Sequence, residues 1–333
     1  MHRPDQSPVK ESPMKAIVQN SFGSADSLTL RDIDRPVPRA DEVLVRVHAA
    51  GVDPSVWHLM TGRPYIARIS PQVGLRRPAC PVAGWDLAGT VESVGARVTG
   101  CRAGDEVFGS GTGSFAEYAR AKAAKIAPKP AGLTFEQAAV LPVSGVTALQ
   151  ALAAARPRPG TRVLVIGASG GVGTYAVQLA AHHGARVTGV CGPAGAALVG
   201  SLGAADVLDY TREDLTGRYD LIVDAAGNRP LRALRRLLAP RGTAVLVGGE
   251  NAGPVLGGLD RNLRALLLST PVRERLRPLV AVVRRPDLLT LKELAEKGAV
   301  VPVVDRAYPL AEAPAAVRHL RDGHPLGKLV VTV

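Results

Sequence analysis

The chain has few cysteines, and their spacing limits the sites that they can form. Only Cys80, Cys101 and Cys191 occur among the 333 residues, far apart and without a CxxC pair. An odd number at such spacing excludes a disulfide framework and a four-cysteine zinc lobe. We therefore expect a reducing, cytoplasmic compartment.

Aromatic residues and long apolar runs are also scarce. Aromatics make up 4% of the chain and do not interleave with the arginines that dominate its net charge of +12. Because those arginines are dispersed, they predict a solvated surface and argue against a nucleic-acid partner. No apolar run reaches the roughly 18 to 20 residues that span a bilayer, so no membrane partner is expected. Residues 1–13 are polar and proline-rich, lack the apolar core of a secretory signal, and are predicted to be a disordered tail.

Two hydrophobic patterns divide the rest of the chain. With 333 residues, 46% of them hydrophobic, the chain can bury two cores. Short apolar runs fill residues 14–130, and Val43, Val45 and Val47 recur at every second position, as in a β-strand. This part is predicted to be a β-rich, barrel-like domain. Residues 299–333 lose the pattern of the middle of the chain and are predicted to complete that domain.

Strand-like and helix-like segments alternate between residues 131 and 298. This alternation implies a parallel sheet with right-handed crossovers. We therefore predict an α/β fold whose second domain, 131–298, is a doubly wound nucleotide-binding sheet. Its strands are expected at 163–167, 186–191, 206–210, from 219, 243–249 and 276–284.

A glycine-rich turn provides the sharpest local signal. In VLVIGASGGVGTYAVQLA, an apolar strand leads through Gly167, Gly170, Gly171 and Gly173 into an amphipathic helix. Glycines allow a tight turn, a close approach of the backbone to a pyrophosphate, and close packing of helix on strand. The free N–H groups at the start of the helix then bind the phosphate. This segment predicts a dinucleotide site.

The choice of dinucleotide is read at the end of the second strand. An acidic residue there would bind the 2′-hydroxyl of NAD, but the chain has Val190, Cys191, Gly192 and Pro193. Because no carboxylate repels a 2′-phosphate, NADP (NADPH) is favoured, with NAD as the alternative. No Ser, Lys or Arg follows directly, so a donor for the phosphate must come from elsewhere.

Several longer motifs together resemble the zinc-free, quinone oxidoreductase-like branch of the medium-chain dehydrogenase/reductase superfamily. The similarity runs from Met14 to Val333. It implies a GroES-like catalytic domain, a Rossmann domain, and a nicotinamide bound in the cleft between them. The motifs are MKAIV, AAGVDPSVWHLMTGRPY, PVAGWDLAGTVESVGARVTGCRAGDEVFG, GSFAEYA, LPVSGVTALQAL, GASGGVGTYAVQLA, SLGAADVLDY and GKLVVTV.

The resemblance assigns cofactor contacts by position. Ser169, Gly171 and Val172 would face the pyrophosphate, and Tyr210 would lie beside the adenosine ribose and its 2′-phosphate. The family's usual serine after Cys191 is replaced by Gly192. The residues implied around the nicotinamide half are Thr147, Ala225, Ala226, Gly248, Gly249, Gly327 and Lys328.

The positions of the family's catalytic zinc carry other residues here. Where zinc-dependent members have a cysteine and a GHE motif, this chain reads Val52-Asp53-Pro54 and Gly84-Trp85-Asp86. A tetrahedral site cannot be built without Cys or His ligands. Asp53, Asp86, His48 and His58 could in principle gather a metal, but we expect none.

Without zinc, no Lewis acid polarises a carbonyl, so easily reduced acceptors are favoured. We predict hydride transfer to a quinone, activated enone or other small carbonyl compound. Asp53, His58 and Tyr65 are the candidates for the polar, catalytic wall of the pocket, with Trp57 and Trp85 as its apolar walls. The alternatives are a secondary-alcohol dehydrogenase and a dinucleotide-binding sensor or nucleic-acid partner with little turnover. A homodimer is a further possibility.

Overall fold

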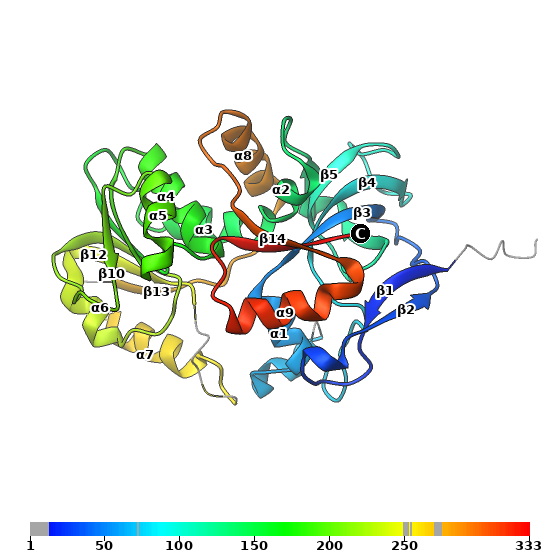
Figure 1. The fold of residues 1–333 in the computed structure, drawn as a ribbon, viewed down its shortest axis with the longest axis horizontal. Helices are drawn as coiled ribbons and strands as arrows, with labels where there is room; N and C mark the ends of the chain where they lie inside the picture. Colours follow the sequence, from blue (N-terminus) through cyan, green and yellow to red (C-terminus); the bar gives the residue numbers. More distant parts are fainter. Residues whose placement is uncertain (1–12, 72, 249–252, 254, 270–274) are drawn as a thin grey trace, which may run out of the picture.

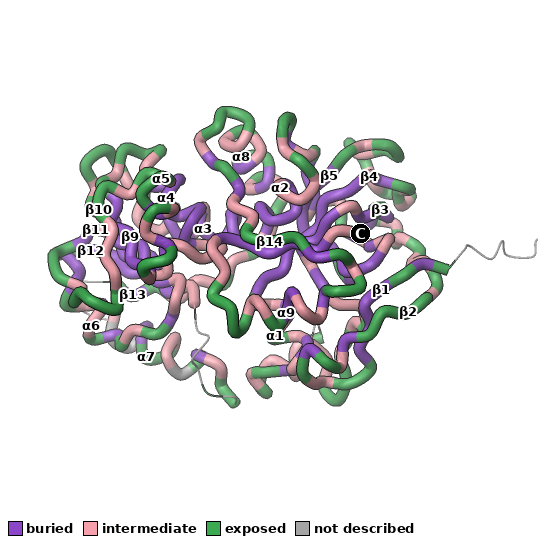
Figure 2. The backbone as a smooth tube through the Cα atoms, viewed as in Figure 1, coloured by how far each residue is buried: buried purple, intermediate pink, exposed green. Residues whose placement is uncertain are grey.

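The computed structural model describes residues 13–71, 73–248, 253, 255–269 and 275–333. Two lobes lie side by side in Figure 1, each built around its own sheet. The buried segments in Figure 2 run through both sheets and through the region where the lobes meet. No helix among the described residues is long and apolar enough to cross a membrane.

The first lobe contains a seven-stranded sheet centred on strand β3 (Glu42–Val52). Val43, Val45 and Val47 are buried, because β3 has neighbouring strands along its whole length. Antiparallel partners flank it, and a short separate sheet joins β1 and β2. The other elements are β1 (Met14–Val18), β2 (Thr29–Ile33), α1 (Pro54–Thr61), β4 (Asp86–Val94), β5 (Glu106–Ser110), β6 (Tyr118–Lys122) and β7 (Ile126–Pro128).

The end of the chain returns to this sheet. Strand β15 (Lys328–Thr332) pairs antiparallel with β3, and β14 (Val304–Pro309) pairs parallel with β15. Helix α9 (Ala313–Asp322) connects them. Two strands of the first sheet are thus supplied by the last 30 residues or so, as a discontinuous domain requires. The bounds 14–130, 131–298 and 299–333 stay predictions.

The second lobe is a six-stranded, all-parallel sheet in the order β10-β9-β8-β11-β12-β13. Numbered within the lobe, this order is 3-2-1-4-5-6, that of a Rossmann sheet. The predicted fold class is therefore confirmed. Its strands are β8 (Arg162–Ile166), β9 (Arg186–Cys191), β10 (Asp206–Asp209), β11 (Tyr219–Asp224), β12 (Leu238–Leu246) and β13 (Arg275–Pro278). Its helices are α3 (Pro142–Ala153), α4 (Gly171–His182), α5 (Ala196–Ser201), α6 (Leu231–Leu237), α7 (Leu259–Ser269) and α8 (Arg285–Glu296).

Two strand predictions for this lobe were wrong in their bounds. The strand expected at 276–284 ends at Pro278, because Pro278 lacks an N–H and only Leu246 remains opposite it in β12. The strand expected from 243 begins already at Leu238, which pairs with Tyr219 before a shift in register. These two differences concern β12 and β13, so they leave the carboxyl ends of the central strands β8 and β11 unchanged.

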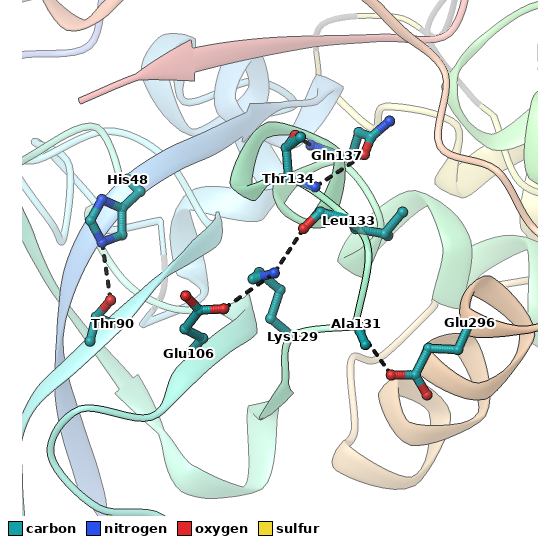
Figure 3. Close-up of polar contacts among 9 residues, drawn as sticks. All are labelled: His48, Thr90, Glu106, Lys129, Ala131, Leu133, Thr134, Gln137 and Glu296. Carbon is teal, nitrogen blue, oxygen red and sulfur yellow. Dashed lines mark hydrogen bonds and ion pairs between the residues drawn. The ribbon is translucent and has the colours of Figure 1, made fainter.

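The connection between the lobes is fastened to both of them (Figure 3). Lys129 forms an ion pair with Glu106 of β5 at 3.2 Å and donates to the carbonyl of Leu133 at 2.7 Å. The N–H of Ala131 donates to Glu296 of α8 at 2.8 Å. A capping box of Thr134 and Gln137 then starts helix α2 (Phe135–Ala139). The short linker is therefore held at each end by a different lobe.

Candidate active site

The glycine loop lies at the carboxyl end of β8 and leads into α4. Gly167 has φ +82°, a conformation that other residues rarely adopt. A Cβ on Gly173 would lie 2.0 Å from the carbonyl oxygen of Gly167, so the helix can approach the strand only with glycine there. Gly170 caps α4, and the helix begins at Gly171 with its free N–H groups facing the loop.

The chain leaving the neighbouring strand β11 lies beside this loop. The N–H groups of Ala225 and Ala226 both donate to the carbonyl of Ile166, at 3.0 and 3.2 Å. The N–H of Gly248, after β12, donates to the carbonyl of Asp224 at 3.1 Å. The order of strands reverses between β8 and β11, and ligands of such sheets bind at that point.

A buried ion pair holds these last two turns together. Arg261 of α7 contacts Asp224 at 2.6 Å, and Asp224 is fully buried. The same guanidinium donates to the carbonyl of Gly248 at 3.3 Å and to that of Arg229 at 3.0 Å. Arg261 thereby fixes the turns that follow β11 and β12.

The returning end of the chain lies directly against the glycine loop. The N–H of Gly327 donates to the carbonyl of Ser169 at 2.8 Å. The side chain of Lys328 then passes so close to Gly171 that a Cβ there would lie 2.7 Å from Lys328 Cδ. Lys328 is 3% exposed, and its ammonium has no hydrogen-bond partner within the described chain. A buried, unpaired ammonium at a helix N-terminus calls for an anion.

Two buried carboxyl groups of the first lobe lie near this ammonium. Burial and the carboxylate of Asp53 raise the pKa of Asp86 well above its usual value, while Lys328 and the N–H of Val143 act in the opposite direction. That N–H donates to both oxygens of Asp86, at 3.3 and 3.2 Å. Asp53 caps α1, its Oδ1 accepting from the N–H of Ser55 at 2.8 Å. Its Oδ2 is buried with no partner among the described groups.

Comparisons with known proteins agree with this architecture. The chain is 33% identical to the chloroplast envelope quinone oxidoreductase homolog of Arabidopsis thaliana, over 96% of this chain and 98% of that protein. It is 32% identical to an NADPH-dependent alkenal/one oxidoreductase of the same plant, over 96% and 79%. The solved quinone oxidoreductase of Coxiella burnetii has a TM-score of 0.83 at 30% identity, over 96% and 99%. The chain belongs to the quinone oxidoreductase family of medium-chain dehydrogenases/reductases.

Two family descriptions match separate parts of the chain. Residues 39–131 match the alcohol dehydrogenase GroES-like domain. Residues 202–331 match the family described as zinc-binding dehydrogenase. That second match excludes the two segments, 52–54 and 84–86, in which zinc-dependent members of the superfamily would carry their ligands. The match therefore carries no information on a metal.

The four residues considered for a metal do not come together. No group of three or more His, Cys, Asp or Glu side chains that could hold an ion occurs within the described ranges. His48 stacks on Phe135 and forms a 3.1 Å hydrogen bond with Thr90 (Figure 3). Asp53 and Asp86 are left as a pair beside Lys328.

The three candidates for the polar wall of the substrate pocket differ in burial. Asp53 is buried at the junction, whereas His58 is exposed and its Nδ1 donates to the carbonyl of Arg63 at 3.0 Å. Tyr65 is 44% exposed, with the guanidinium of Arg68 over its ring. Among the described residues, no hydrogen bond joins Asp53 to either side chain, and a shared catalytic role of the three stays a prediction.

Of the remaining predicted cofactor residues, Ser169, Val172, Cys191 and Gly192 lie at or after the carboxyl ends of β8 and β9, whereas Thr147 lies on α3. Thr147 is buried on α3, where its hydroxyl donates to the carbonyl of Val143 at 2.6 Å. Cys191 ends β9, and a Cβ on Gly192 would lie 3.7 Å from the ring of Tyr210. Ser169 and Val172 belong to the glycine loop and the first turn of α4. Gly249 lies outside the described residues.

The sequence does not predict the Arg261–Asp224 ion pair, and it does not predict the part that Asp86 plays. Arg261 and Asp224 are separated by 37 positions and belong to no motif, so no local pattern could pair them. Asp86 had been considered only as a metal ligand. The sequence does hold a signal for this part. Asp86 begins the apolar run that becomes β4, and a carboxyl group buried there needs a hydrogen-bond or charge partner.

Proposed function

We propose that this protein is an NADPH-dependent reductase that transfers a hydride to a quinone or an activated enone or other carbonyl compound without a metal. The observation that carries the proposal is the side chain of Lys328, which passes Gly171 at the N-terminus of α4 and whose buried ammonium has no hydrogen-bond partner among the described residues. A dinucleotide pyrophosphate would supply a hydrogen-bond acceptor for it.

The residues present fit a nicotinamide dinucleotide. A Cβ would fill the cradle at Gly171 and Gly173, and the orphaned ammonium of Lys328 closes it from the opposite lobe. Gly167, Ser169, Gly170, Gly171, Val172 and Gly173 would hold the pyrophosphate, whereas Thr147, Ala225, Ala226, Gly248, Gly249 and Gly327 would surround the nicotinamide half. Lys328, which the resemblance assigns to the nicotinamide half, is proposed to reach the pyrophosphate instead, because its side chain passes Gly171. When bound, the nicotinamide supplies the hydride.

NADP is the proposed form of the cofactor, with NAD as the weaker alternative. Cys191 and Gly192 offer no carboxylate to a ribose. Tyr210, 52% exposed, stands beside Gly192 and can donate its hydroxyl to a 2′-phosphate. Arg212 is the nearest candidate for a charge partner, but it contacts Asp209 at 3.7 Å and would have to turn away from it.

The protein's own side chains would manage the proton and the developing charge. The raised pKa of Asp86 keeps its carboxyl group protonated to higher pH, so the group can donate a hydrogen bond as negative charge grows on the acceptor oxygen. Asp53 presents a free Oδ2 at the same junction. His58 and Tyr65 are proposed to contact the outer part of the substrate, since both lie further out.

The absence of zinc ligands limits the acceptor. The segments Val52-Asp53-Pro54 and Gly84-Trp85-Asp86 stand where zinc-dependent members carry their ligands, and neither contains a Cys or a His. Quinones and activated enones need no Lewis acid, because the charge that follows hydride addition is delocalised. The names of two relatives, a quinone oxidoreductase homolog and an alkenal/one oxidoreductase, support this substrate class.

The test pairs an NADPH oxidation assay with a panel of quinones and enones and an NADP+ reduction assay with secondary alcohols, each run with and without a strong chelator. Turnover of quinones or enones, with no stoichiometric zinc by elemental analysis, is the expected result. Chelator-sensitive oxidation of alcohols would instead favour a secondary-alcohol dehydrogenase. Tight binding of NADPH without turnover of any acceptor would favour a sensor.

Compartment and assembly complete the proposal. Cys80, Cys101 and Cys191 are all free thiols, which supports a reducing, cytoplasmic setting. A homodimer stays a prediction, to be tested by sedimentation of the purified protein.

A further inference from the structure

A small cavity in the first lobe is bordered by Gly84 and Trp85, the two residues that precede Asp86. It measures about 30 Å³, more than the roughly 10–15 Å³ that one water requires. Its wall is mostly apolar, with Leu59 and Met60 of α1 and the side of Trp85. Trp85 borders the cavity and directly precedes Asp86, the first residue of β4.

The side chains of Gln19, Cys80 and Thr112 interrupt this apolar wall. Gln19 is 5% exposed, and its Oε1 is buried with no hydrogen-bond partner in the described structure. Cys80 borders the same cavity, and its thiol donates only to the carbonyl of Val82, at 3.3 Å. Left without a donor, the Oε1 of Gln19 costs about 1–3 kcal/mol, and a half-turn of the amide would present its Nε2 donor to the cavity instead.

We propose that this cavity binds a short α,β-unsaturated aldehyde or ketone, which adds covalently to the thiol of Cys80. The sulfur forms a bond to the β-carbon while the carbon–carbon double bond is lost, and the thiol proton ends on the α-carbon. No electrons are exchanged with a third compound. A half-turn of the Gln19 amide brings its Nε2 donor toward the ligand's carbonyl oxygen, where the negative charge of the addition develops.

The size and the chemistry of the cavity select this class. A space this small admits a chain of a few carbons rather than a fused quinone ring. Burial raises the pKa of the Cys80 thiol, with the Val82 carbonyl and Arg120 acting in the opposite direction, so the adduct forms slowly near neutral pH. This inference rests on the proposed function in one respect, because short enones are among the hydride acceptors proposed above.

Intact-protein and peptide mass spectrometry after incubation with methyl vinyl ketone, without cofactor, tests the proposal. We expect the mass of one reagent molecule to be added first at Cys80, and this adduct to be lost in Cys80→Ser. Cys101→Ser is the matched control, because burial also raises the pKa of Cys101, yet Cys101 does not border the cavity. Gln19→Leu should slow the adduct about tenfold if it removes one hydrogen bond.

Thermal unfolding of each variant establishes that it is folded. Equal labelling of Cys101 and Cys80, or an unchanged rate in folded Gln19→Leu, would overturn the inference. A parallel assay of NADPH oxidation with a bulky naphthoquinone separates the two proposals. Reductase activity without a Cys80 adduct would refute the proposed binding of enones in the cavity and leave the proposed function standing. An adduct without any reductase activity would refute the proposed function and leave the cavity proposal standing.

Discussion

Gly327 donates its N–H to the carbonyl of Ser169 at 2.8 Å, which ties the last strand of the chain to the glycine loop of the other lobe. Because Lys328 follows directly, this hydrogen bond fixes where its ammonium lies relative to α4. The site is thus assembled from two lobes, and a change in either one should alter cofactor binding.

Lys328→Met should weaken NADPH binding about tenfold to a hundredfold, because a charge-assisted contact supplies roughly 1.5–3 kcal/mol. Titration calorimetry measures the affinity, and thermal unfolding establishes that the variant is folded. Lys292→Met, at a helix-surface ion pair with Glu296, is the control and should leave affinity unchanged. Unchanged affinity in Lys328→Met would remove this residue from the phosphate site.

Gly173→Val should abolish NADPH binding while the first lobe stays folded. A Cβ at this position would meet the Gly167 carbonyl at 2.0 Å, so the start of α4 must move away from β8. Gly200→Ala is the matched control within another helix of the same lobe, where a Cβ meets no atom within 4 Å. Calorimetry that finds parental affinity in the valine variant would show that the loop is not the cofactor site.

The sequence predicted the features that are local. The strand, turn and helix around Gly167 to Gly173 are encoded in neighbouring residues, and the alternation of segments predicted the parallel sheet. Contacts between distant segments could not be predicted in the same way. The Arg261–Asp224 ion pair depends on where α7 packs, and the burial of Lys328 depends on how the chain's end meets α4. His58 and Tyr65 share a motif with Asp53, yet the course of α1 and of the turn after it carries them away from Asp53.

The preference for NADPH over NADH should be modest, closer to tenfold than to a hundredfold in kcat/KM. Gly192→Ser should increase it, because a Cβ at Gly192 has ordinary van der Waals space of 3.7 Å to Tyr210 and the added hydroxyl can meet the 2′-phosphate. Arg212→Ala should decrease it if Arg212 turns from Asp209 toward the phosphate. An NADH preference in the parent protein would contradict the assignment. If the ratio of kcat/KM for NADPH to that for NADH were the same in both variants as in the parent, residues other than Gly192 and Arg212 would recognise the 2′-phosphate.

Asp86→Asn should change how stability depends on pH. Because the pKa of Asp86 is raised in the folded protein above the ordinary 3.8, its protonated form stabilises the fold fully below that value. This contribution is lost as pH rises through the folded pKa. The free energy of unfolding in urea should therefore fall less steeply with rising pH in Asp86→Asn than in the parent. Asp220→Asn should change the pH dependence in the opposite direction. The hydrogen bond with Arg162 lowers the pKa of Asp220, so the stability that the ionised Asp220 contributes is lost as pH falls. Parallel curves for Asp86→Asn and the parent would contradict the raised pKa.

The most direct test of metal-free hydride transfer is to follow the hydrogen itself. The protein is stripped with chelator and supplied with an enone and with NADPH that carries deuterium at its transferable position. Mass spectrometry and NMR of the product should find one deuterium on the β-carbon of the former enone, at a rate that the chelator does not change. A product without deuterium, or turnover that stops with chelator and returns with zinc, would contradict the proposed reaction.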